Sequence, residues 1–406
     1  MPEAVIVATA RSPIGRANKG SLVNARPDDL SAQIVKAVMA KVPQLDPNEV
    51  EDLILGCGQP AGEAGYNLGR VVALLAGLDN APGVTVNRYC SSSLQTVRMA
   101  AHAIRAGEGD VFVAAGVETV SRFLHGASDV GPHNPVFADA EARTQARTQG
   151  GQGTWAPFEG GLPDIYIAMG QTAENVAEHE DVAREDMDEF AARSQQRAER
   201  SSENGFWEME ITPVTTTDAE GNEVTVSSDD GIRPGTTGEK RARPRPSSRP
   251  DGKTTAGNAC PLNDGAAAVV VMSDTRAAEL GITPLARVVS SGVSALDPEI
   301  MGMGPVGASR QALERAGMTI DDIDLVEINE AFAAQVIPSA RHLGIDWDKL
   351  NVNGGSIALG HPFGMTGARI MTTLIHGLQE ADATFGLETM CVGGGQGMAM
   401  IVERLS

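Results

Sequence analysis

The sequence predicts an α/β protein with helices layered against mostly parallel sheets, and three observations support this fold class. Apolar strand-like runs alternate with amphipathic helix-like runs along most of the chain, which is typical of βαβ units. Glycine is frequent, with 46 of 406 residues, and clusters after strand-like runs, where it permits tight turns and close approach of the backbone to a ligand. Residues 47–56 and 319–328 share an acidic turn followed by a short apolar strand. This likeness indicates two related halves.

The individual elements follow from hydrophobic periodicity. Short apolar, often β-branched runs predict the strands Val5–Ala8, Asp52–Gly56, Val111–Ala115, Ala267–Met272, Ala286–Gly292, Leu325–Asn329 and Met398–Val402. Apolar residues with helical spacing predict the helices Leu30–Ala40, Ser91–Ala106, Asp164–His179, Arg184–Glu199, Ala308–Ala316, Ala331–Leu343 and Gly364–Glu380.

The middle of the chain has a different composition. Residues 123–253 are polar, rich in loops and poor in strand signal, apart from a hairpin expected near Gly221. Arg241 to Pro250 holds three prolines and four arginines, which excludes a helix or a central strand there. We therefore predict an N-terminal half (residues 1–122 and 254–283), an inserted loop domain (123–253) and a C-terminal half (284–406).

Composition and charge exclude several classes of protein. The formal net charge is −21, which disfavours nucleic-acid binding because phosphate contacts need a basic surface. No apolar run approaches the ~20 residues of a membrane span, and no secretory signal is expected at the N-terminus. The four cysteines, Cys57, Cys90, Cys260 and Cys391, form no CxxC pair. Neither a disulfide framework nor a metal site is expected, and a cytoplasmic location is predicted.

Two residues at predicted turns before helices are candidates for catalysis. Cys90 lies where a strand-like run meets a helix, and the amides and dipole of a helix N-terminus stabilise a thiolate. The alternative is a buried, inert cysteine. His361 precedes Pro362 and has glycines on both sides, which leaves room for a ligand beside the imidazole. The alternative is a histidine that only satisfies its own hydrogen bonds.

Two further segments carry polar groups at strand ends. Cys391 is followed by Gly393, Gly394 and Gly395, whose backbone amides can bind a developing oxyanion. This glycine run has neither the spacing of a dinucleotide-binding fingerprint nor the lysine of a P-loop. Asn329 follows a predicted strand. It either orients a water or a histidine, or caps the next helix.

Taken together, the four segments resemble the thiolase family, which includes acetyl-CoA acetyltransferases and 3-ketoacyl-CoA thiolases. The segments, in chain order, are Asn87–Ser93, Asn329–Ala333, Gly360–Pro362 and Cys391–Gly397. The likeness extends from Ala10 to the C-terminus. It implies a duplicated five-layered αβαβα core with a loop domain inserted in the first half, assembled as a homodimer or homotetramer.

The resemblance also implies a role for each of these residues. Cys90 would accept the acyl group, and His361 would assist formation of its thiolate and hold a thioester oxygen. Cys391 would act as acid and base at the acetyl methyl group. Asn329 would fix a water that forms one oxyanion hole with His361. The amides of Cys90 and Gly393 would form the other.

Coenzyme A is implied as a substrate, with no permanently bound cofactor and no metal. The implied substrate contacts are Arg233, Met169, Cys260, Met301, Phe332 and Ser248. Simple packing is the alternative for the methionines. The basic segment Lys240–Lys253 either attracts the CoA phosphates or is a solvated loop. Five positions depart from the family pattern. Ser93 replaces a glycine and is expected to narrow the pocket, Cys260 replaces a serine, and Ser248 replaces an aromatic residue. Arg241 and Pro244 replace apolar residues of the same loop. Altered CoA affinity or a repositioned loop is therefore expected.

The expected function is thiolytic cleavage of 3-ketoacyl-CoA to acetyl-CoA and a shortened acyl-CoA, or the reverse Claisen condensation, through an acyl-cysteine. Acyl-CoA substrates and partner enzymes of β-oxidation are the expected partners. The alternatives are a biosynthetic acetoacetyl-CoA-forming thiolase, a ketoacyl-carrier-protein synthase and a non-catalytic CoA-binding protein on the same fold. A ketoacyl-carrier-protein synthase pairs its cysteine with two histidines. In this chain Asn329 stands where the second of those histidines would be.

Overall fold

The computed structural model describes residues 2–123, 130–151, 153–218, 220–242 and 244–406. The strands are β1 (Ala4–Arg11), β2 (Gly15–Arg16), β3 (Asp52–Cys57), β4 (Gly83–Val86), β5 (Val111–Thr119), β6 (Val214–Thr217), β7 (Glu223–Val226), β8 (Asn263–Ser273), β9 (Ala286–Ala295), β10 (Leu325–Ile328), β11 (Phe385–Val392) and β12 (Gln396–Arg404). The helices are α1 (Pro27–Ala40), α2 (Leu68–Ala76), α3 (Ser92–Ala106), α4 (Ala138–Arg147), α5 (Met169–His179), α6 (Arg184–Glu203), α7 (Phe206–Glu210), α8 (Gly238–Ala242), α9 (Asp274–Leu280), α10 (Gly304–Ala316), α11 (Ala333–Leu343), α12 (Ser356–Leu359) and α13 (Thr366–Glu380).

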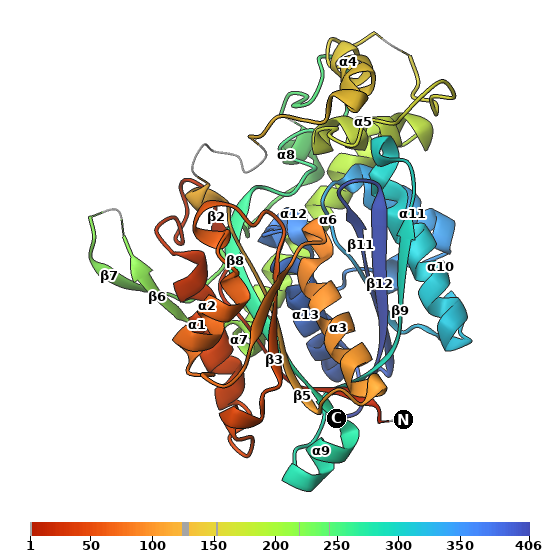
Figure 1. Ribbon diagram of the computed structural model, residues 1–406. Coiled ribbons are helices and arrows are strands. Elements are labelled where there is room, and N and C mark those ends of the chain that lie inside the picture. Colours follow the sequence, from red (N-terminus) through yellow and green to blue (C-terminus); the bar gives the residue numbers. More distant parts are fainter. Residues whose placement is uncertain (1, 124–129, 152, 219, 243) are drawn as a thin grey trace.

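The described part of the chain forms five layers around a sharply bent sheet. The strand order is β10-β11-β12-β9-β1-β8-β5-β3-β4, with β2 beside β8. β1 and β9 pair only through Val5–Arg287 and Ile6–Ala286, so the sheet divides into two half-sheets that face each other (Figure 1). Helices α3 and α13 pack together between the half-sheets, α1 and α2 cover one outer face, and α10 and α11 cover the other. The layered α/β class predicted from the sequence is confirmed, but the expectation of mostly parallel sheets is wrong. In the described residues only β3–β4, β3–β5 and β10–β11 pair in parallel, and the other strand pairs of this sheet are antiparallel.

The two half-sheets repeat one connectivity. β3 runs parallel to β5 in the first, and β10 runs parallel to β11 in the second. The next strands, β8 and β12, are antiparallel to these and lead to the antiparallel strands β1 and β9. Short 3-10 turns, Pro47–Glu49 and Ile320–Asp322, precede β3 and β10. The sequence likeness between residues 47–56 and 319–328 therefore marks equivalent positions in the two halves.

Several boundaries differ from the predicted ones. The helix expected from Asp164 begins at Met169, and α2 was not among the predicted helices. The strand-like run expected before Cys90 is β4. The expectation that no helix enters the arginine- and proline-rich segment was wrong, because α8 reaches Ala242. This helix ends before Pro244, whose ring would clash with a preceding helical turn. The expected hairpin is present as β6 and β7, and Gly221 adopts φ +85° between them.

One apolar core joins the two halves. It holds Leu94 of α3 and Val269 of β8 together with Leu374 of α13 and Met398 of β12, all essentially inaccessible to solvent. Cys90, Leu359 and Met365 belong to the same cluster. The loops that precede α3 and α13 are therefore fixed by packing from both half-sheets. Within the described ranges, no helix is long and apolar enough to cross a membrane.

Candidate active site

Cys90 lies in a single 3-10 turn, Tyr89–Ser91, between β4 and α3. Tyr89 adopts φ +42°, a left-handed conformation that costs free energy in a residue with a side chain. Local hydrogen bonds hold the turn: the Tyr89 N–H donates to Asn87 Oδ1 at 2.8 Å, and the Arg88 N–H donates to Ser92 Oγ at 2.9 Å. Cys90 is thus presented at the start of α3, with 8% of its surface exposed.

Close backbone contacts bring this turn and the His361 loop onto the ends of β3 and β5. A Cβ at Gly56 would lie 2.5 Å from the Ser92 carbonyl carbon, and one at Gly116 would lie 2.0 Å from the Gly364 carbonyl oxygen. One at Gly364 would lie 2.1 Å from the Val117 carbonyl oxygen. Only glycine fits at these three positions. They allow the two loops to meet at the carboxyl ends of the parallel strands.

Three thiols gather at this point. The backbone amide of Gly393 lies near the sulfur of Cys90 and acts to lower the pKa of its thiol. Burial raises the pKa of Cys90 to about 12, although this amide and the amide of Cys90 itself act in the opposite direction. Burial also raises the pKa values of Cys391 and Cys260, and the charge of a Cys90 thiolate raises both further. Cys90, Cys260 and Cys391 are free thiols. They lie close enough that a charge on Cys90 shifts the pKa values of the other two.

The glycine-rich turn between β11 and β12 explains why the Gly393 amide is available. Gly394 and Gly395 adopt φ +76° and +75°, so the chain reverses immediately after Gly393 and the turn needs no hydrogen bond from its amide. Arg88, beside the nucleophile turn, donates to Gln396 Oε1 at 2.8 Å. The turn that carries Gly393 is therefore tied to the turn that carries Cys90.

His361 and Asn329 are in contact in a fully buried site. Asn329 Nδ2 lies 3.2 Å from His361 Nε2 and 3.5 Å from His361 Nδ1, so the amide lies over the face of the ring. His361 Nδ1 lies 2.6 Å from Thr366 Oγ1. Burial and the nearby charge of Arg369 lower the pKa of His361 to about 3. The imidazole is therefore neutral at physiological pH.

Glu118 connects the histidine loop to the nucleophile turn, and the sequence analysis missed it. Its carboxylate accepts the N–H groups of Gly58 at 2.8 Å and Gly364 at 2.9 Å. A Cβ at Gly58 would lie 2.8 Å from Phe363 Cβ and 3.3 Å from the Tyr89 carbonyl oxygen. Burial raises the pKa of Glu118 to about 7. The signal that could have found Glu118 is a carboxylate just after the predicted strand Val111–Ala115 and Gly116.

A groove of about 460 Å³ leads toward the thiols. Arg16, Arg233 and Lys240 line it together with Cys260. The backbone N–H of Cys260 donates to the Ala331 carbonyl at 3.0 Å. Ala331, in turn, packs with Met301, Phe332 and Cys391 in a small apolar cluster. The structure therefore brings Arg233, Cys260, Met301 and Phe332 to one region.

Met169 and Ser248 lie together but do not line this groove. Gln171 of α5 donates to the Ser248 carbonyl, and a Cβ at Gly170 would lie 2.1 Å from Ser248 Oγ. Ser93 does not narrow the site as expected. Its hydroxyl oxygen instead accepts the Ala368 N–H at 2.9 Å and so caps α13.

The basic segment divides into two parts. Lys240 lines the groove. Arg249 pairs with Glu178 at 2.6 Å, and Lys253 Nζ donates to the Val182 carbonyl at 2.7 Å, so both contribute to internal packing. Arg243 lies outside the described residues.

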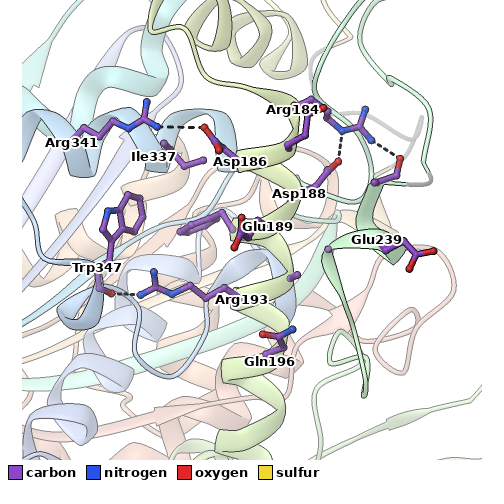
Figure 2. Close-up of a pocket in the computed structure, with 15 residues that line it drawn as sticks. Arg184, Asp186, Asp188, Glu189, Arg193, Gln196, Glu239, Ile337, Arg341 and Trp347 are labelled. Carbon is purple, nitrogen blue, oxygen red and sulfur yellow. Dashed lines mark hydrogen bonds and ion pairs between the residues drawn. The ribbon is translucent and has the colours of Figure 1, made fainter.

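A larger cavity of about 1040 Å³ lies between α6, α8 and α11 (Figure 2). Two ion pairs lie in its lining: Arg184 with Asp188 at 2.6 Å and Arg341 with Asp186 at 3.6 Å. None of the predicted site residues lines it, so the reaction is assigned to the thiol site. Among the described residues, no group of three or more His, Cys, Asp or Glu side chains is arranged to hold a metal ion.

Comparison with known proteins identifies the family. Residues 4–275 match the model of the thiolase N-terminal domain, and residues 282–404 match that of the thiolase C-terminal domain. The chain belongs to the thiolase family. A 3-ketoacyl-CoA thiolase of Aeromonas salmonicida is 44% identical over 410 residues and covers 100% of both chains. One of Bacillus subtilis is 42% identical and covers 99% of this chain and 100% of its own.

A solved thiolase-family structure has the same fold. The crystal structure of the Bacillus anthracis acetyl-CoA acetyltransferase superposes with a TM-score of 0.85 at 38% identity, covering 100% of this chain and 99% of that one. The predicted family, the thiolase fold and the classification as an acyltransferase are confirmed.

Proposed function

We propose that this thiolase cleaves 3-ketoacyl-CoA with CoA, giving acetyl-CoA and a shortened acyl-CoA, and that Cys90 carries the acyl group between the two steps. The observation that carries this proposal is the proximity of Cys90, Cys391 and the Gly393 amide to Cys260, which lines a groove together with three cations. Thioester exchange needs a sulfur nucleophile, and an enolate needs hydrogen-bond donors that are already in place.

Cleavage begins with Cys90 and His361. At neutral pH Cys90 is a thiol and His361 is a neutral base, because burial raises the pKa of the first and lowers that of the second. We propose that the Cys90 proton passes to His361 as the sulfur attacks the 3-keto carbon. The bond between C2 and C3 then breaks. Cys391 donates a proton to the departing acetyl-CoA enolate, and acyl-Cys90 remains.

The second step transfers the acyl group to CoA. The thiol of CoA attacks acyl-Cys90, its proton passes to the Cys391 thiolate, and Cys90 leaves as a thiolate that regains its proton from His361. The amides of Cys90 and Gly393 stabilise the oxyanion on the acyl carbon. Asn329, through the water that it fixes, and His361 form the oxyanion hole for the thioester oxygen of the acetyl group. This scheme is ping-pong.

Coenzyme A is the substrate that the groove is proposed to hold. Arg16, Arg233 and Lys240 supply positive charge for its phosphates, in a chain whose net charge is −21. The pantetheine would pass Cys260 and reach Cys90. No permanently bound cofactor enters the scheme.

The degradative direction is favoured by the relatives named 3-ketoacyl-CoA thiolase, which are 42–44% identical to this chain. The acetyl-CoA acetyltransferase structure, at 38% identity, supports acetoacetyl-CoA synthesis as the second candidate. A cytoplasmic location and association with other β-oxidation enzymes stay predictions.

A homodimer is proposed on the exposed edge of the first half-sheet. β4 is the terminal strand there and has a half-buried side-chain pattern. Nearby apolar side chains are exposed: Tyr66 (86%), Leu74 (50%) and Leu75 (42%). A free strand edge beside apolar side chains suits pairing with a second copy.

Two assays test the proposed function. Cleavage of acetoacetyl-CoA by the wild-type chain is compared with cleavage by Cys90→Ala, which should lose at least about a thousandfold in kcat. Equal rates would end the catalytic proposal. A series of 3-ketoacyl-CoA esters of increasing length then separates the degradative from the biosynthetic candidate, because a strict preference for the four-carbon ester supports only the latter.

A further inference from the structure

Glu118, near the end of β5, carries a buried carboxyl group that the proposed reaction does not use. One of its oxygens, Oε2, accepts the N–H of Gly58 at 2.8 Å and the N–H of Gly364 at 2.9 Å. The other, Oε1, accepts the N–H of Gln59 at 3.2 Å and lies 3.6 Å from the Cys57 sulfur. A single oxygen atom therefore joins the segment that follows β3 to the His361 loop.

Both joined segments lie against the proposed catalytic groups. The ring of Phe363, the residue before Gly364, packs edge-on against the His361 ring with the centroids 5.2 Å apart. A Cβ at Gly58 would lie 2.8 Å from Phe363 Cβ and 3.3 Å from the carbonyl oxygen of Tyr89, the residue before Cys90. The backbone of Gly58 thus separates the support of the imidazole from the nucleophile turn. By holding Gly58 and Gly364 together, Glu118 fixes how the two approach each other.

The full set of hydrogen bonds needs the carboxylate form of Glu118. Its partners Gly58, Gln59 and Gly364 offer backbone N–H groups, which can only donate. A proton on Oε2 would occupy a lone pair that Gly58 or Gly364 now uses, and a proton on Oε1 would compete with the Gln59 N–H. Of the four partners only the Cys57 sulfur could accept that proton, and sulfur is a weak acceptor. Protonation of Glu118 therefore weakens the link between the two segments.

We propose that Glu118 is a positioning residue: its carboxylate holds the His361 loop against the nucleophile turn, and its protonation releases the loop and slows acylation of Cys90. The inference rests on the proposed roles of Cys90 and His361. Glu118 itself does not have to contact substrate or transfer a proton.

Glu118 changes charge at a pH where the proposed catalytic groups do not. Burial raises the pKa of Glu118 to about 7, although its three N–H partners act in the opposite direction. Burial also raises the pKa of Cys90 to about 12 and lowers that of His361 to about 3. Of these three groups, only Glu118 titrates between about pH 5.5 and pH 8.5.

The charged groups of the neighbouring elements have other partners. Glu63 and Arg122 line a small hollow together with Cys57 and Glu118, and they pair with each other. The charge of Glu118 also raises the pKa of Cys90 in the nucleophile turn. Further charged groups come from the elements packed on β5: Asp28 and Asp29 of α1 pair with Arg26, Asp264 of β8 hydrogen-bonds Ser121, and Arg369 of α13 faces Glu327.

The test measures the single-turnover rate at which acetoacetyl-CoA acetylates Cys90 in the full chain. Free CoA is left out, so that ionisation of its thiol does not contribute. The wild-type rate should fall about 10- to 100-fold between pH 8.5 and pH 5.5, the usual range for partners that orient a functional group. It should recover fully when the sample returns to pH 8.5. The half-saturating concentration of acetoacetyl-CoA should change less than about twofold, because Glu118 does not line the groove.

Glu118→Gln imitates the protonated form. The amide can accept hydrogen bonds at only one end, and its NH2 group then meets the Gln59 N–H or the N–H groups of Gly58 and Gly364. At pH 8.5 this variant should react about 10- to 100-fold more slowly than wild type, with a rate nearly independent of pH.

Asp264→Asn is the matched control. Burial raises the pKa of Asp264 to about 6, but its carboxylate hydrogen-bonds Ser121 and neither of the two loops. This variant should keep the wild-type dependence on pH. Infrared difference spectra give a readout that does not depend on activity: between pH 8.5 and pH 5.5 the wild type should gain a protonated-carboxyl band that Glu118→Gln lacks.

Several results would overturn the inference. One is a wild-type acetylation rate that is the same at pH 5.5 and pH 8.5, whether or not Glu118→Gln folds. Others are a Glu118→Gln variant with the wild-type pH dependence, an Asp264→Asn variant without it, and a loss of rate at pH 5.5 that is not recovered at pH 8.5, which would indicate acid unfolding.

Cys90→Ala separates this inference from the proposed function. If Cys90→Ala is inactive in acetoacetyl-CoA cleavage while Glu118→Gln behaves as wild type, only the positioning role fails. If Cys90→Ala is fully active, the proposed function fails as well.

Discussion

At the scale of single residues, the site is built from groups whose ordinary ionisation is suppressed. Cys90 is a thiol whose pKa burial raises to about 12, and His361 is an imidazole whose pKa burial lowers to about 3. Both are neutral near pH 7. The resting site therefore holds no preformed thiolate and imidazolium pair, and charge develops there only when substrate arrives.

The ionisation of Cys90 predicts its reactivity. Below its pKa the thiolate fraction of Cys90 grows about tenfold per pH unit, so alkylation by iodoacetamide in the absence of substrate should keep rising from pH 7 to pH 10. Mass spectrometry of the modified peptide, with Cys90→Ala as the blank, measures the rate for this residue. A plateau reached below pH 8 would contradict the prediction, because it would mean that Cys90 is already ionised.

Arg233 is predicted to act on CoA binding and not on the chemical step. An exposed charge contact contributes about 0.5–1 kcal/mol, so Arg233→Gln should raise KM for CoA about two- to fivefold, with kcat nearly unchanged. Added salt should reduce the difference between variant and wild type. Arg245→Gln is the control, since Arg245 belongs to the same basic segment but does not line the groove. Equal effects of the two substitutions would exclude a specific role for Arg233.

At the scale of elements, two loops converge because strand ends and helix starts approach at backbone distance. Gly56 on β3 and Gly116 on β5 lie against the nucleophile turn and the histidine loop. Ser93, at the start of α3, hydrogen-bonds the start of α13. Each helix N-terminus is thus held by the other half of the molecule, and Cys90 and His361 are positioned by the same contact.

Gly116→Ala should separate these loops. Its new Cβ would lie 2.0 Å from the Gly364 carbonyl oxygen and 2.5 Å from Ser93 Cβ, an overlap that typically costs about 1–3 kcal/mol of stability. The shift would displace His361 from Cys90. The kcat of the folded variant should therefore fall by more than the loss of folded protein accounts for. Gly131→Ala, where a Cβ meets nothing within 4 Å, should be silent. Urea unfolding and acetoacetyl-CoA cleavage measure the two effects, and full activity in folded Gly116→Ala would refute the argument.

At the scale of the whole molecule, two equivalent halves share one interior. Helices α3 and α13 pack against each other and against both half-sheets, and a single apolar cluster contains residues of both halves. The half-sheets themselves are joined by only two residue pairs of β1 and β9. Cohesion therefore comes mainly from the shared helical layer, and the halves should unfold together.

Leu94→Ala tests this cooperativity. Leu94 is fully buried in the shared core, and removing such a side chain costs about 2–5 kcal/mol. Hydrogen exchange should lose protection equally in β5 of the first half and β11 of the second. Loss confined to β5, with β11 unaffected, would show that the halves are stabilised independently.

The sequence by itself indicated the layered α/β class, the equivalence of residues 47–56 and 319–328, and the placement of Cys90, His361, Cys391 and Asn329 at the ends of elements. Hydrophobic periodicity and glycine placement are local properties of the chain, so they can be read without coordinates. The same reasoning missed α2 and set the start of α5 too early, because short segments and element ends depend on tertiary packing.

Only the tertiary structure decided which groups touch. It showed that Glu118 joins two loops, that Ser93 caps α13, that Arg249 is used internally, and that Ser356 donates to Asn329 Oδ1. These contacts link residues up to 275 positions apart, as between Ser93 and Ala368. The direction of a hydrogen bond and the ionisation of a buried group depend on neighbours brought together by folding, and no local pattern of residues contains that information.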